Sequence, residues 1–378
     1  MIKKIEIENF KSYLKTSLEL GPFNVLVGPN DSGKTNFLSA LRLLKYIAQG
    51  RISEFFEALP YYFVHCQIPG CNQYIKMSID IELETESLIY SIVIDESPSN
   101  GIFIAEESLF DSKNRDMFYL KREKDVILAL NEEIREEETK TFESNQTALP
   151  LLTDMKTNKH AWLVTQKLKN ILFYNFDTRR MSEPRSKMSE RNLILSEMGT
   201  NLSNVLFTLS NEHKENFERL KSLLKKEISY VSDLEIRESE QYLYVLVSFD
   251  TRYKLFGEMV SDGLIKLLGI LALVCSPASA FQISIEEIEN HVHPHRLECA
   301  IDHLRSLTLR PDPSQVILTT HSPSVLNLTK PKEILIVERS PAKGSNITPL
   351  MKKQDIAPFL KEMPIGDIWL SRIIGGVP

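Results

Sequence analysis

The chain lacks an excess of positive charge. Its 378 residues include 45 lysines and arginines against 51 aspartates and glutamates, which gives a formal net charge of −6. A protein that binds nucleic acid through its overall charge would be basic. Any contact with DNA or RNA therefore has to come from a local basic patch.

Cysteine is scarce. The four cysteines are Cys66, Cys71, Cys275 and Cys299, and their spacings match neither a disulfide framework nor a zinc motif. We therefore expect reduced thiols and a cytoplasmic protein. His65 beside Cys66 and Cys71 leaves a small metal site as a minor alternative, because a second pair of ligands is missing.

Long uninterrupted apolar runs are missing too. The longest uncharged stretch, 267–285, has the length of a membrane span, but Pro277, Gln282 and serines interrupt it. We interpret it as a buried helix, a turn and a buried strand, and expect no membrane partner. Residues 1–10 alternate charged and apolar side chains, so no signal peptide is expected there.

What the chain does contain is the mixture of strand and helix patterns typical of an α/β protein. An apolar run at 23–28 predicts a buried strand followed by a helix, and 75–95 predicts two antiparallel strands with a turn near Glu86. From 107 to 190 the chain is polar and charge-rich. We predict a mostly helical or loop insertion there, with the acidic run at 131–140 on a solvated face. The other predicted elements are a strand at 2–10, helices at 201–209 and 213–229, and strands around 242–250.

The strongest motif is GPNDSGKT at 28–35. It fits the phosphate-loop pattern G-x-x-x-x-G-K-[ST] and stands between a strand and a helix. Gly28 and Gly33 allow a tight turn whose amides, with the positive end of the helix, surround an anion. Lys34 is placed to reach the β- and γ-phosphates, and Thr35 to ligate Mg²⁺. The motif therefore predicts a nucleoside triphosphate site.

Two carboxylates end a second buried strand. In FQISIEE, Glu286 and Glu287 directly follow the apolar residues. Ligands of α/β sheets bind at the carboxyl ends of strands. We therefore expect Glu286 on the Mg²⁺ side and Glu287 as the general base that polarises water. Two solvated glutamates are the ordinary alternative.

Two weaker elements accompany the carboxylates. Ser261, Asp262 and Gly263 open an apolar helix, where the serine is either an N-cap or, with the helix amides, part of a second anion site. His321 follows an apolar strand in QVILTTHSP. At the same sheet edge it would donate a hydrogen bond to the γ-phosphate, although a lone histidine after a strand is more often structural.

Taken in order, these motifs resemble an ABC-type ATPase head. GPNDSGKT, SDG at a helix start, IEEIEN followed by HP, and TTHSP are similar to the RecF/SMC-like, AAA_21-type branch of stand-alone bacterial ATPases. That branch is related to the ATPase half of the overcoming-lysogenization-defect (OLD) nucleases. The segments IEIENFKSY, MGTNLSNVL and IGDIWLSRIIGG extend the resemblance over most of the chain outside 107–190.

The resemblance implies a role for each matched residue. Glu287 and His321 look like the catalytic glutamate and the switch histidine, while Thr35 and Glu286 look like the Mg²⁺ ligands. The implied ATP-contacting residues are Lys11, Ser12, Asn30, Asp31, Ser32, Gly33, Lys34, Thr35, Asn36, Ser261, Asp262 and Gly263. The last three look like the signature motif, which in this family contacts ATP bound to a partner subunit.

Several positions depart from the family pattern. Ile288 stands where proline usually follows the carboxylates, His291-Val292 stand where Gly-Leu usually precedes His-Pro, and Leu264 replaces a common threonine. No Q-loop glutamine is recognisable. Glu289-Asn290 would form the turn that meets the partner subunit. The histidines at 291, 293 and 295 leave a metal site as a minor alternative.

We therefore expect an α/β P-loop NTPase, an ABC-ATPase head with a mixed sheet. Residues 1–106 would form a first lobe, 107–190 a largely helical insertion, 191–340 a second lobe, and 341–378 a tail packed on the head. The expected activity is Mg²⁺-dependent ATP hydrolysis between two subunits, which drives a conformational switch.

The resemblance also implies partners. These are a homodimer or higher homo-oligomer formed through ATP and a separate effector protein, for which a nuclease is one candidate, with DNA or RNA as further candidates. The implied role is bacterial phage defence or DNA maintenance. The stretch after His321 is short for an independent domain and shows no clustered acidic motif, so we expect no nuclease activity in this chain.

Three other functions stay open. The first is an ATP-locked sensor or scaffold dimer with little turnover that recruits or restrains an effector. A phosphotransferase is disfavoured because it has no use for a signature motif. A transporter ATPase subunit is disfavoured because the Q-loop is missing and the signature is SDG.

Overall fold

The computed structural model describes residues 1–84, 86–99, 101–123, 125–187, 192–250, 253–354 and 356–374. These fold into two compact units. The first unit consists of Met1–Ile171 with Pro331–Pro378, and the second of Leu172–Lys330. Each unit holds part of the motif set.

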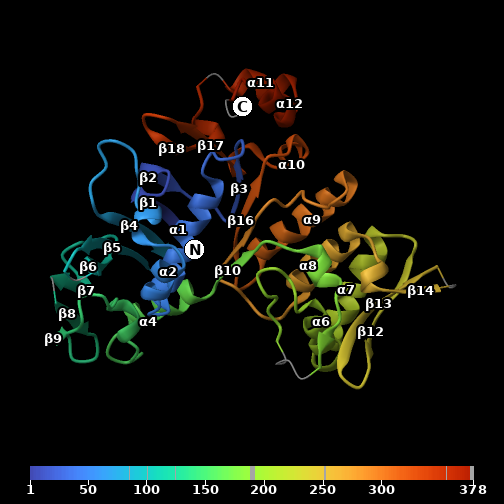
Figure 1. Cartoon of the computed structure of the whole chain (residues 1–378), viewed down its shortest axis with the longest axis horizontal. Helices are drawn as coiled ribbons and strands as arrows, with labels where there is room; N and C mark the ends of the chain where they lie inside the picture. The colour runs from blue at the N-terminus through green and yellow to red at the C-terminus, as the bar shows by residue number, and fades with distance from the viewer. Residues whose placement is uncertain are drawn as a thin grey trace. The chain divides into compact units, whose positions relative to one another are not determined.

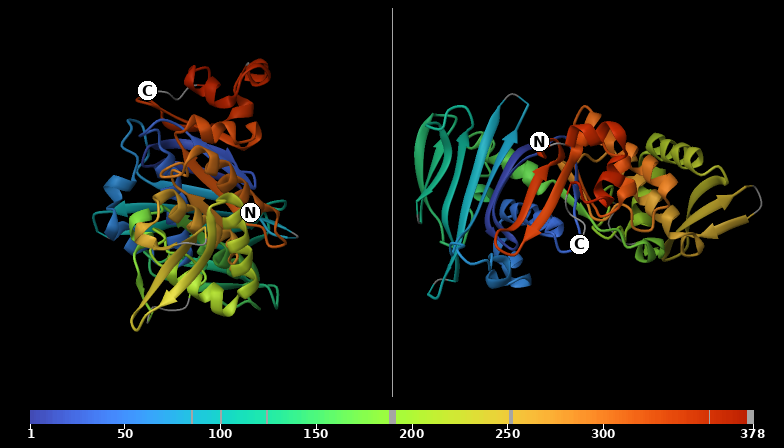
Figure 2. Two further views of the ribbon diagram at one scale, coloured as in Figure 1. Left: turned by 90° about the vertical axis from the view of Figure 1, so that its right-hand side faces the viewer. Right: turned by 90° about the horizontal axis from the view of Figure 1, so that it is seen from above.

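The first unit is built on a mixed sheet with the strand order β3-β17-β18-β2-β1-β4-β5-β6-β7-β8-β9. Figure 2 shows the strands β4 to β9, coloured blue to green, side by side. β3 and β17 are parallel, whereas the pairs from β17–β18 to β8–β9 are antiparallel. The strands are β1 (Ile2–Phe10), β2 (Tyr13–Glu19), β3 (Phe23–Val27), β4 (Ile75–Glu82), β5 (Ser87–Ser97), β6 (Gly101–Asp111), β7 (Phe118–Glu123), β8 (Val126–Asn131), β9 (Glu136–Thr141), β17 (Ile334–Ser340) and β18 (Gly344–Pro349).

Burial in this sheet follows the sequence patterns. All five residues of β3 are buried, as its continuous apolar run predicts. β4 alternates buried and half-buried positions and pairs with β5 across a turn that includes Glu86, as predicted for 75–95. The predicted helix after the phosphate loop is α1 (Lys34–Ala48), which packs against α2 (Ile52–Ala58) and α4 (Lys159–Lys169). The other helices of this unit are α3 (Tyr61–Val64), α11 (Ile356–Glu362) and α12 (Ile365–Leu370), with short 3₁₀ turns at Leu149–Leu151, Pro331–Glu333 and Leu350–Lys352.

The largely helical character predicted for 107–190 is wrong. The second half of β6, from 107 to 111, and all of β7, β8 and β9 lie in this stretch and extend the sheet, and α4 is its longest helix. VILALN in β8 buries every second residue, the period of a strand. The acidic run forms a turn and β9, whose charged side chains are exposed or half-buried, as suits an edge strand. Residues 124 and 188–190 of this stretch lie outside the described residues.

The second unit contains a parallel strand pair and a small antiparallel sheet. β15 (Gln282–Ile285) pairs in parallel with β16 (Gln315–Thr320). β10 (Ile171–Tyr174) leads into this unit. The small sheet has the order β11-β13-β12, with β14 paired to β13. Its strands are β11 (Arg185–Ser186), β12 (Val231–Glu238), β13 (Tyr242–Phe249) and β14 (Tyr253–Phe256).

A buried helix organises the second unit. α8 (Asp262–Cys275) packs against α5 (Thr178–Ser182), α6 (Leu202–Glu212), α7 (Lys214–Glu227) and α9 (Pro294–Ser306). Figure 1 shows α8 among α6, α7 and α9. All its residues from Leu264 to Cys275 are buried, as expected for a helix that is apolar all round. The run at 267–285 is thus a helix, a turn and a strand. A short helix, α10 (Pro323–Asn327), follows β16.

The division into units differs from the predicted lobes. β17 and β18 belong to the sheet of the first unit, although 331–340 was assigned to the second lobe and 341–349 to the tail. β17 is an apolar strand that pairs with β3, a non-local contact that local patterns do not reveal. The four cysteines are free. Among the described residues, no helix combines the length and apolar character needed to cross a bilayer.

Candidate functional site

In the first unit, the loop between β3 and α1 holds a buried cation. The Lys34 ammonium folds back into the loop and donates to the carbonyl oxygens of Gly28 at 2.7 Å and Pro29 at 2.8 Å. Lys34 is only 8% exposed. Gly33 has φ +118°, a conformation that in practice only glycine adopts. The lysine is therefore held inside the loop by the loop's own backbone.

Close packing also requires both glycines. A Cβ on Gly28 would lie 2.4 Å from the carbonyl oxygen of Val337, and one on Gly33 would lie 2.4 Å from the Ser345 hydroxyl. α1 begins directly after Gly33, which has no side chain to cap the helix. The N-cap residue thus gives the first-turn amides no side-chain partner, which suits a helix start that binds an anion.

A chain of polar side chains supports this loop from neighbouring strands. The Asn36 side-chain amide donates to the Ser12 hydroxyl at 2.8 Å. The hydroxyl of Ser345 lies 2.8 Å from that of Ser12 and donates to the Ser32 carbonyl at 2.6 Å. Ser12 and Asn36 therefore lie against the loop. The adjacent Lys11 places its ammonium 5.9 Å from the Phe10 ring centroid. Sequence reasoning missed Ser345, because its β18 position becomes relevant only through sheet pairing.

The fit to a phosphate group rests on two observations. The backbone of the loop lies too close to its neighbours for any side chain at Gly28 or Gly33. The Ser32 hydroxyl is buried and has no hydrogen-bond partner among the described residues. Asn30, Asp31 and Thr35 are exposed on the same loop. An oxyanion is the chemical class that such a ring of donors accommodates.

In the second unit, Glu286 and Glu287 form a fixed turn after β15. The amide of Glu286 donates to the Tyr174 carbonyl at 2.9 Å, and that of Glu287 to the Thr319 hydroxyl at 3.0 Å. Glu287 has φ +44°. The side-chain amide of Asn290 donates to the Glu287 carboxylate. The backbone and the carboxylate of Glu287 are therefore both held in place.

Lys266 anchors this turn from α8. Its ammonium donates to the carbonyl oxygens of Glu287 at 3.0 Å and Asn290 at 2.8 Å, although the residue is only 2% exposed. Burial lowers the pKa of Lys266 to about 8, and the nearby Glu289 and Glu287 partly oppose that shift. Sequence reasoning missed this residue. The available signal was a lysine one turn into an otherwise apolar helix.

Glu289 holds His321 in place, a role that the sequence did not predict for it. The Glu289 Oε1 atom accepts the His321 backbone amide at 2.8 Å and lies 3.2 Å from its Nδ1. The Glu289 side chain is 12% exposed and that of His321 46%. Because Nδ1 faces the carboxylate, Nε2 is the ring nitrogen left to act elsewhere. Glu289 was predicted only as part of a turn facing a partner subunit.

The SDG segment lies at the start of α8. Ser261 is the N-cap residue, but its side chain makes no capping hydrogen bond. Ser261 and Asp262 are exposed. Gly263 packs so tightly that a Cβ would lie 2.7 Å from the carbonyl oxygen of His291, and the Asp262 carboxylate lies 3.7 Å from His291 Nδ1. The segment thus packs on the turn after Glu287, and the serine hydroxyl does not cap the helix.

Some of these groups line an open cavity of about 400 Å³ in the second unit, whereas Ser261 and His321 are not among its lining residues. Its lining carries both signs of charge, from Asp177, Asp262, Glu286, Glu287, Arg179 and Lys266. The other lining residues are Asn175, Phe176, Thr178, Met198, Asn290 and His291. The structure therefore brings Asp262, Glu286 and Glu287 together around one cavity.

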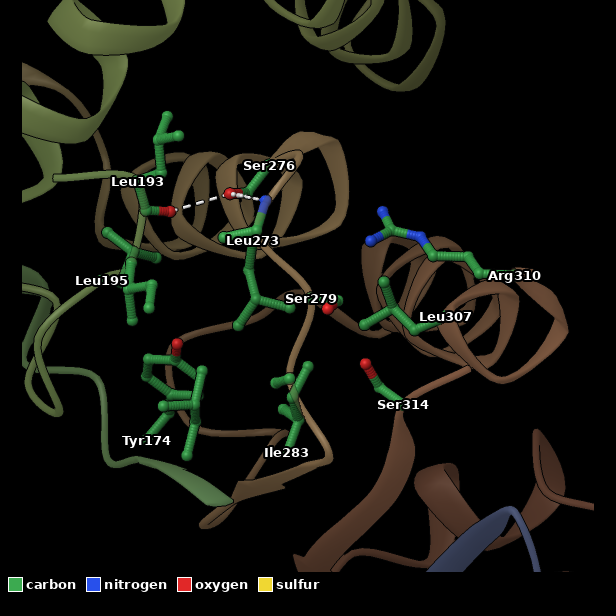
Figure 3. Close-up of a pocket in the computed structure, with 14 residues that line it drawn as sticks. Tyr174, Leu193, Leu195, Leu273, Ser276, Ser279, Ile283, Leu307, Arg310 and Ser314 are labelled. Carbon is green, nitrogen blue, oxygen red and sulfur yellow. Dashed lines mark hydrogen bonds between the residues drawn. The ribbon is translucent and has the colours of Figure 1, made fainter. Parts of the chain in front are cut away.

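A second cavity of the same unit is a packing gap. Figure 3 shows Tyr174, Leu195, Leu273 and Ile283 around it, with the Ser276 hydroxyl donating to the Leu193 carbonyl at 2.8 Å. Its volume is about 20 Å³, enough for about one water molecule. It has no place in a nucleotide site.

Two departures from the family pattern have local explanations. The Ile288 amide donates to the Thr319 carbonyl at 3.3 Å, a bond that proline could not make. His291 has φ +62°, a conformation that favours the glycine usual at this position. The minor metal hypotheses gain no support. In the described part of the chain, neither His65 with Cys66 and Cys71 nor the histidines at 291, 293 and 295 bring three ligand atoms together.

Comparisons with known proteins identify a family and a fold for this chain. A protein-family model described as "AAA domain, putative AbiEii toxin, Type IV TA system" (AAA_21) matches residues 23–327. That range includes the phosphate loop, the SDG segment, the glutamate pair and His321. No curated protein matches the chain.

Solved structures with the same fold are heads of SMC proteins. One is an Smc head bound to the C-terminal winged-helix domain of ScpA, with a TM-score of 0.57, 14% identity, and coverage of 92% of this chain and 96% of that one. Another, derived from Pyrococcus furiosus, is an Smc head domain with an extended coiled coil bound to the C-terminal domain of ScpA. Its TM-score is 0.53 at 13% identity, with coverage of 96% and 99%. The mixed α/β fold is thus that of a P-loop ATPase head of the ABC/SMC type, and the chain belongs to the AAA_21 family of AAA-domain proteins.

Proposed function

We propose that this protein is a Mg²⁺-dependent ATPase in which ATP joins two copies of the chain and hydrolysis releases them. The observation that carries the proposal is the loop at 28–35. There Lys34 is buried inside a backbone ring, two glycines admit no side chain, and a helix begins without a side-chain cap. This is the construction that phosphate-binding loops use for the β- and γ-phosphates.

The donor set fits Mg²⁺. Thr35 is exposed in the first turn of α1, and Glu286 lines the cavity at the end of β15. Hydroxyl and carboxylate oxygens are the hard ligands that Mg²⁺ prefers. When bound, Mg²⁺ would neutralise charge on the phosphates during transfer to water. We assign Thr35 and Glu286 to hold it.

Glu287 is our candidate for the general base. Its backbone is fixed by Thr319 and Lys266, and its carboxylate by Asn290. A carboxylate held in one orientation can accept a proton from an attacking water. His321, oriented by Glu289, would donate from Nε2 to the γ-phosphate. The use of these residues on the same nucleotide as Lys34 rests on the family match, whose range includes them all.

The SDG segment supports the proposed dimer. Ser261 and Asp262 are exposed, and Ser261 does not cap its own helix. An exposed hydroxyl at the positive end of a long helix suits contact with phosphate on another molecule. Two-fold symmetry would then create two identical sites, each completed by the partner's Ser261.

The family description and the solved SMC heads bear on the biological setting. The family description names a toxin of a toxin–antitoxin system. Both SMC heads were solved with a partner protein. We infer that the ATP-driven switch acts on a separate effector in bacterial phage defence or DNA maintenance, with a nuclease as one candidate.

The test is ATP binding and steady-state phosphate release for four variants. Lys34→Ala should lose ATP binding, whereas Glu287→Gln should bind ATP and lose about 10²- to 10⁴-fold in turnover. Lys343→Ala and Glu298→Gln, two exposed positions outside the proposed site, are the matched controls. Failure of the wild-type chain to bind ATP would refute the function. Tight binding with assembly but very slow turnover would favour the ATP-locked sensor.

A further inference from the structure

Three potential metal ligands meet between two helices of the second unit, outside the cavity described above. Glu227 is the last residue of α7, and Cys299 and His303 lie four residues apart on α9. One carboxylate oxygen, the cysteine sulfur and one imidazole nitrogen all lie within 4.8 Å of one another. This is the only such group of three among the described residues. Residues four apart share a helix face, so α9 presents both ligands to α7.

The imidazole nitrogen in this group has no hydrogen bond. His303 Nε2 is buried and has no hydrogen-bond partner in the described part of the chain. Its nearest carboxylate oxygen, on Glu227, is 3.8 Å away, which is an ion-pair distance beyond hydrogen-bond reach. Buried polar atoms rarely go without partners, so a nitrogen left in this way is available for a further ligand.

The three groups are partly exposed, and charges of both signs surround them. The side chains of Glu227 and His303 are 22% and 19% exposed, and Cys299 is half-buried. Burial is the main cause that lowers the pKa of His303, and this favours the neutral imidazole, the form that ligates metals. Asp302 adds a negative charge nearby, while Arg219 and Lys226 oppose it. The positive charges of Arg219 and Lys226 therefore do not outnumber the negative charges of Glu227 and Asp302.

We propose that Glu227, Cys299 and His303 bind a divalent metal ion of the zinc class. Sulfur, imidazole nitrogen and one carboxylate oxygen form a ligand set that selects Zn²⁺ and similar first-row ions over Mg²⁺ and Ca²⁺. Three protein ligands leave one tetrahedral position for water. The ion would tie the end of α7 to α9, the helix that begins just after the turn at 286–293. The proposal does not depend on ATP binding.

The experiment uses the untagged full-length chain, stripped with a chelator and titrated with Co²⁺. Wild-type protein should bind one ion per chain with a thiolate-to-cobalt charge-transfer band, and Zn²⁺ should displace it. Cys299→Ser should lose the band. Glu227→Gln keeps the thiolate but should weaken affinity at least about tenfold, because losing even an outer-shell partner costs that much. Cys71→Ser, at a half-buried free cysteine, is the matched control and should retain full binding.

Other results would overturn the proposal. These are absence of a thiolate band in the wild-type chain, or a band that survives Cys299→Ser and disappears in Cys71→Ser. If Cys299→Ser does not fold, wild-type affinity in Glu227→Gln refutes the site equally. The Cys299 thiol would then simply donate to the Glu227 carboxylate. In either case ATP binding by the wild-type chain is unaffected, so failure of this site is distinct from failure of the proposed function.

Discussion

The buried ammonium of Lys266 lies 3.0 Å from the backbone carbonyl oxygen of Glu287. This bond links α8, the helix that carries the SDG segment at its start, to the turn that carries the candidate general base. A second bond, to the Asn290 carbonyl at 2.8 Å, fixes the other end of the turn. We therefore expect Lys266 to position Glu287.

Lys266→Met should lower kcat for ATP while leaving nucleotide binding nearly unchanged. The turn would lose two charge-assisted hydrogen bonds, and displacement of a catalytic group by about 1 Å can cost about 10²-fold in rate. Lys266→Arg keeps a cation and several donors and should restore much of the activity. If the lysine were only structural, its replacement would lower the stability of the protein but would not lower kcat at an unchanged KM. Steady-state kinetics of the three proteins tests it.

The pH dependence of Lys266 gives a separate readout. Burial lowers its pKa to about 8, so the side chain is charged below that pH and neutral above it. Wild-type kcat should fall as pH rises through about 8, because the hydrogen bonds to the turn lose their charge assistance. Arginine stays protonated there, so Lys266→Arg should lack this fall. Identical profiles for the two proteins would contradict the role of Lys266.

At position 291, substitution of histidine by glycine should give a more stable protein than substitution by alanine. Its φ of +62° costs a residue with a Cβ about 1–2 kcal/mol. His291→Gly relieves that cost, and His291→Ala does not. The glycine variant should therefore be the more stable of the two by about 1 kcal/mol, the reverse of the usual order. Chemical denaturation of the pair measures the difference, and equal or reversed stabilities would refute it.

His160 should make the first unit more stable at acidic pH. Its ring lies between carboxylate oxygens of Glu132 at 2.5 Å and Glu86 at 2.8 Å. Burial alone would lower the pKa of His160, but these two hydrogen bonds outweigh it and raise the pKa above its ordinary value. The stabilisation is therefore complete below the unfolded pKa and is lost as pH rises through the raised folded pKa.

Hydrogen exchange of α4, which carries His160, is the measurement. Protection in wild type should decrease as pH rises through neutrality, after correction for intrinsic exchange rates. His160→Asn should remove that dependence, while His295→Asn, at an exposed histidine, should keep it. The same slope in wild type and His160→Asn would show that another group is responsible.

Local patterns predicted the elements that carry motifs. An apolar strand, two glycines and a helix start specify the loop around Lys34 within a few residues, and the strands before Glu286 and His321 were equally visible. The strands between 107 and 190 were missed because the high charge of β9 indicates a solvated loop or helix. The two-residue period of burial in β8, which indicates a strand, is the better guide to this stretch. Ser345 and Glu289 matter only through contacts with residues distant in sequence, which no local pattern contains.

We propose that ATP is bound between two copies of the chain, with Lys34 from one copy and Ser261 from the other. Lys34→Ala lacks the phosphate clamp, and Ser261→Arg places a bulky side chain at the start of α8. Each variant alone should be inactive. A mixed dimer contains one site with Lys34 from the Ser261→Arg chain and Ser261 from the Lys34→Ala chain, and that site is intact.

The decisive measurement is therefore the ATPase rate of the two inactive variants mixed in equal amounts. Random pairing makes half of the dimers mixed, each with one intact site of two, so the mixture should recover about a quarter of the wild-type rate. A mixture that stays as inactive as its components, beside a wild-type chain that hydrolyses ATP, would contradict the claim. So would a wild-type rate in Ser261→Arg alone, since Ser261 would then be only the residue that precedes a helix.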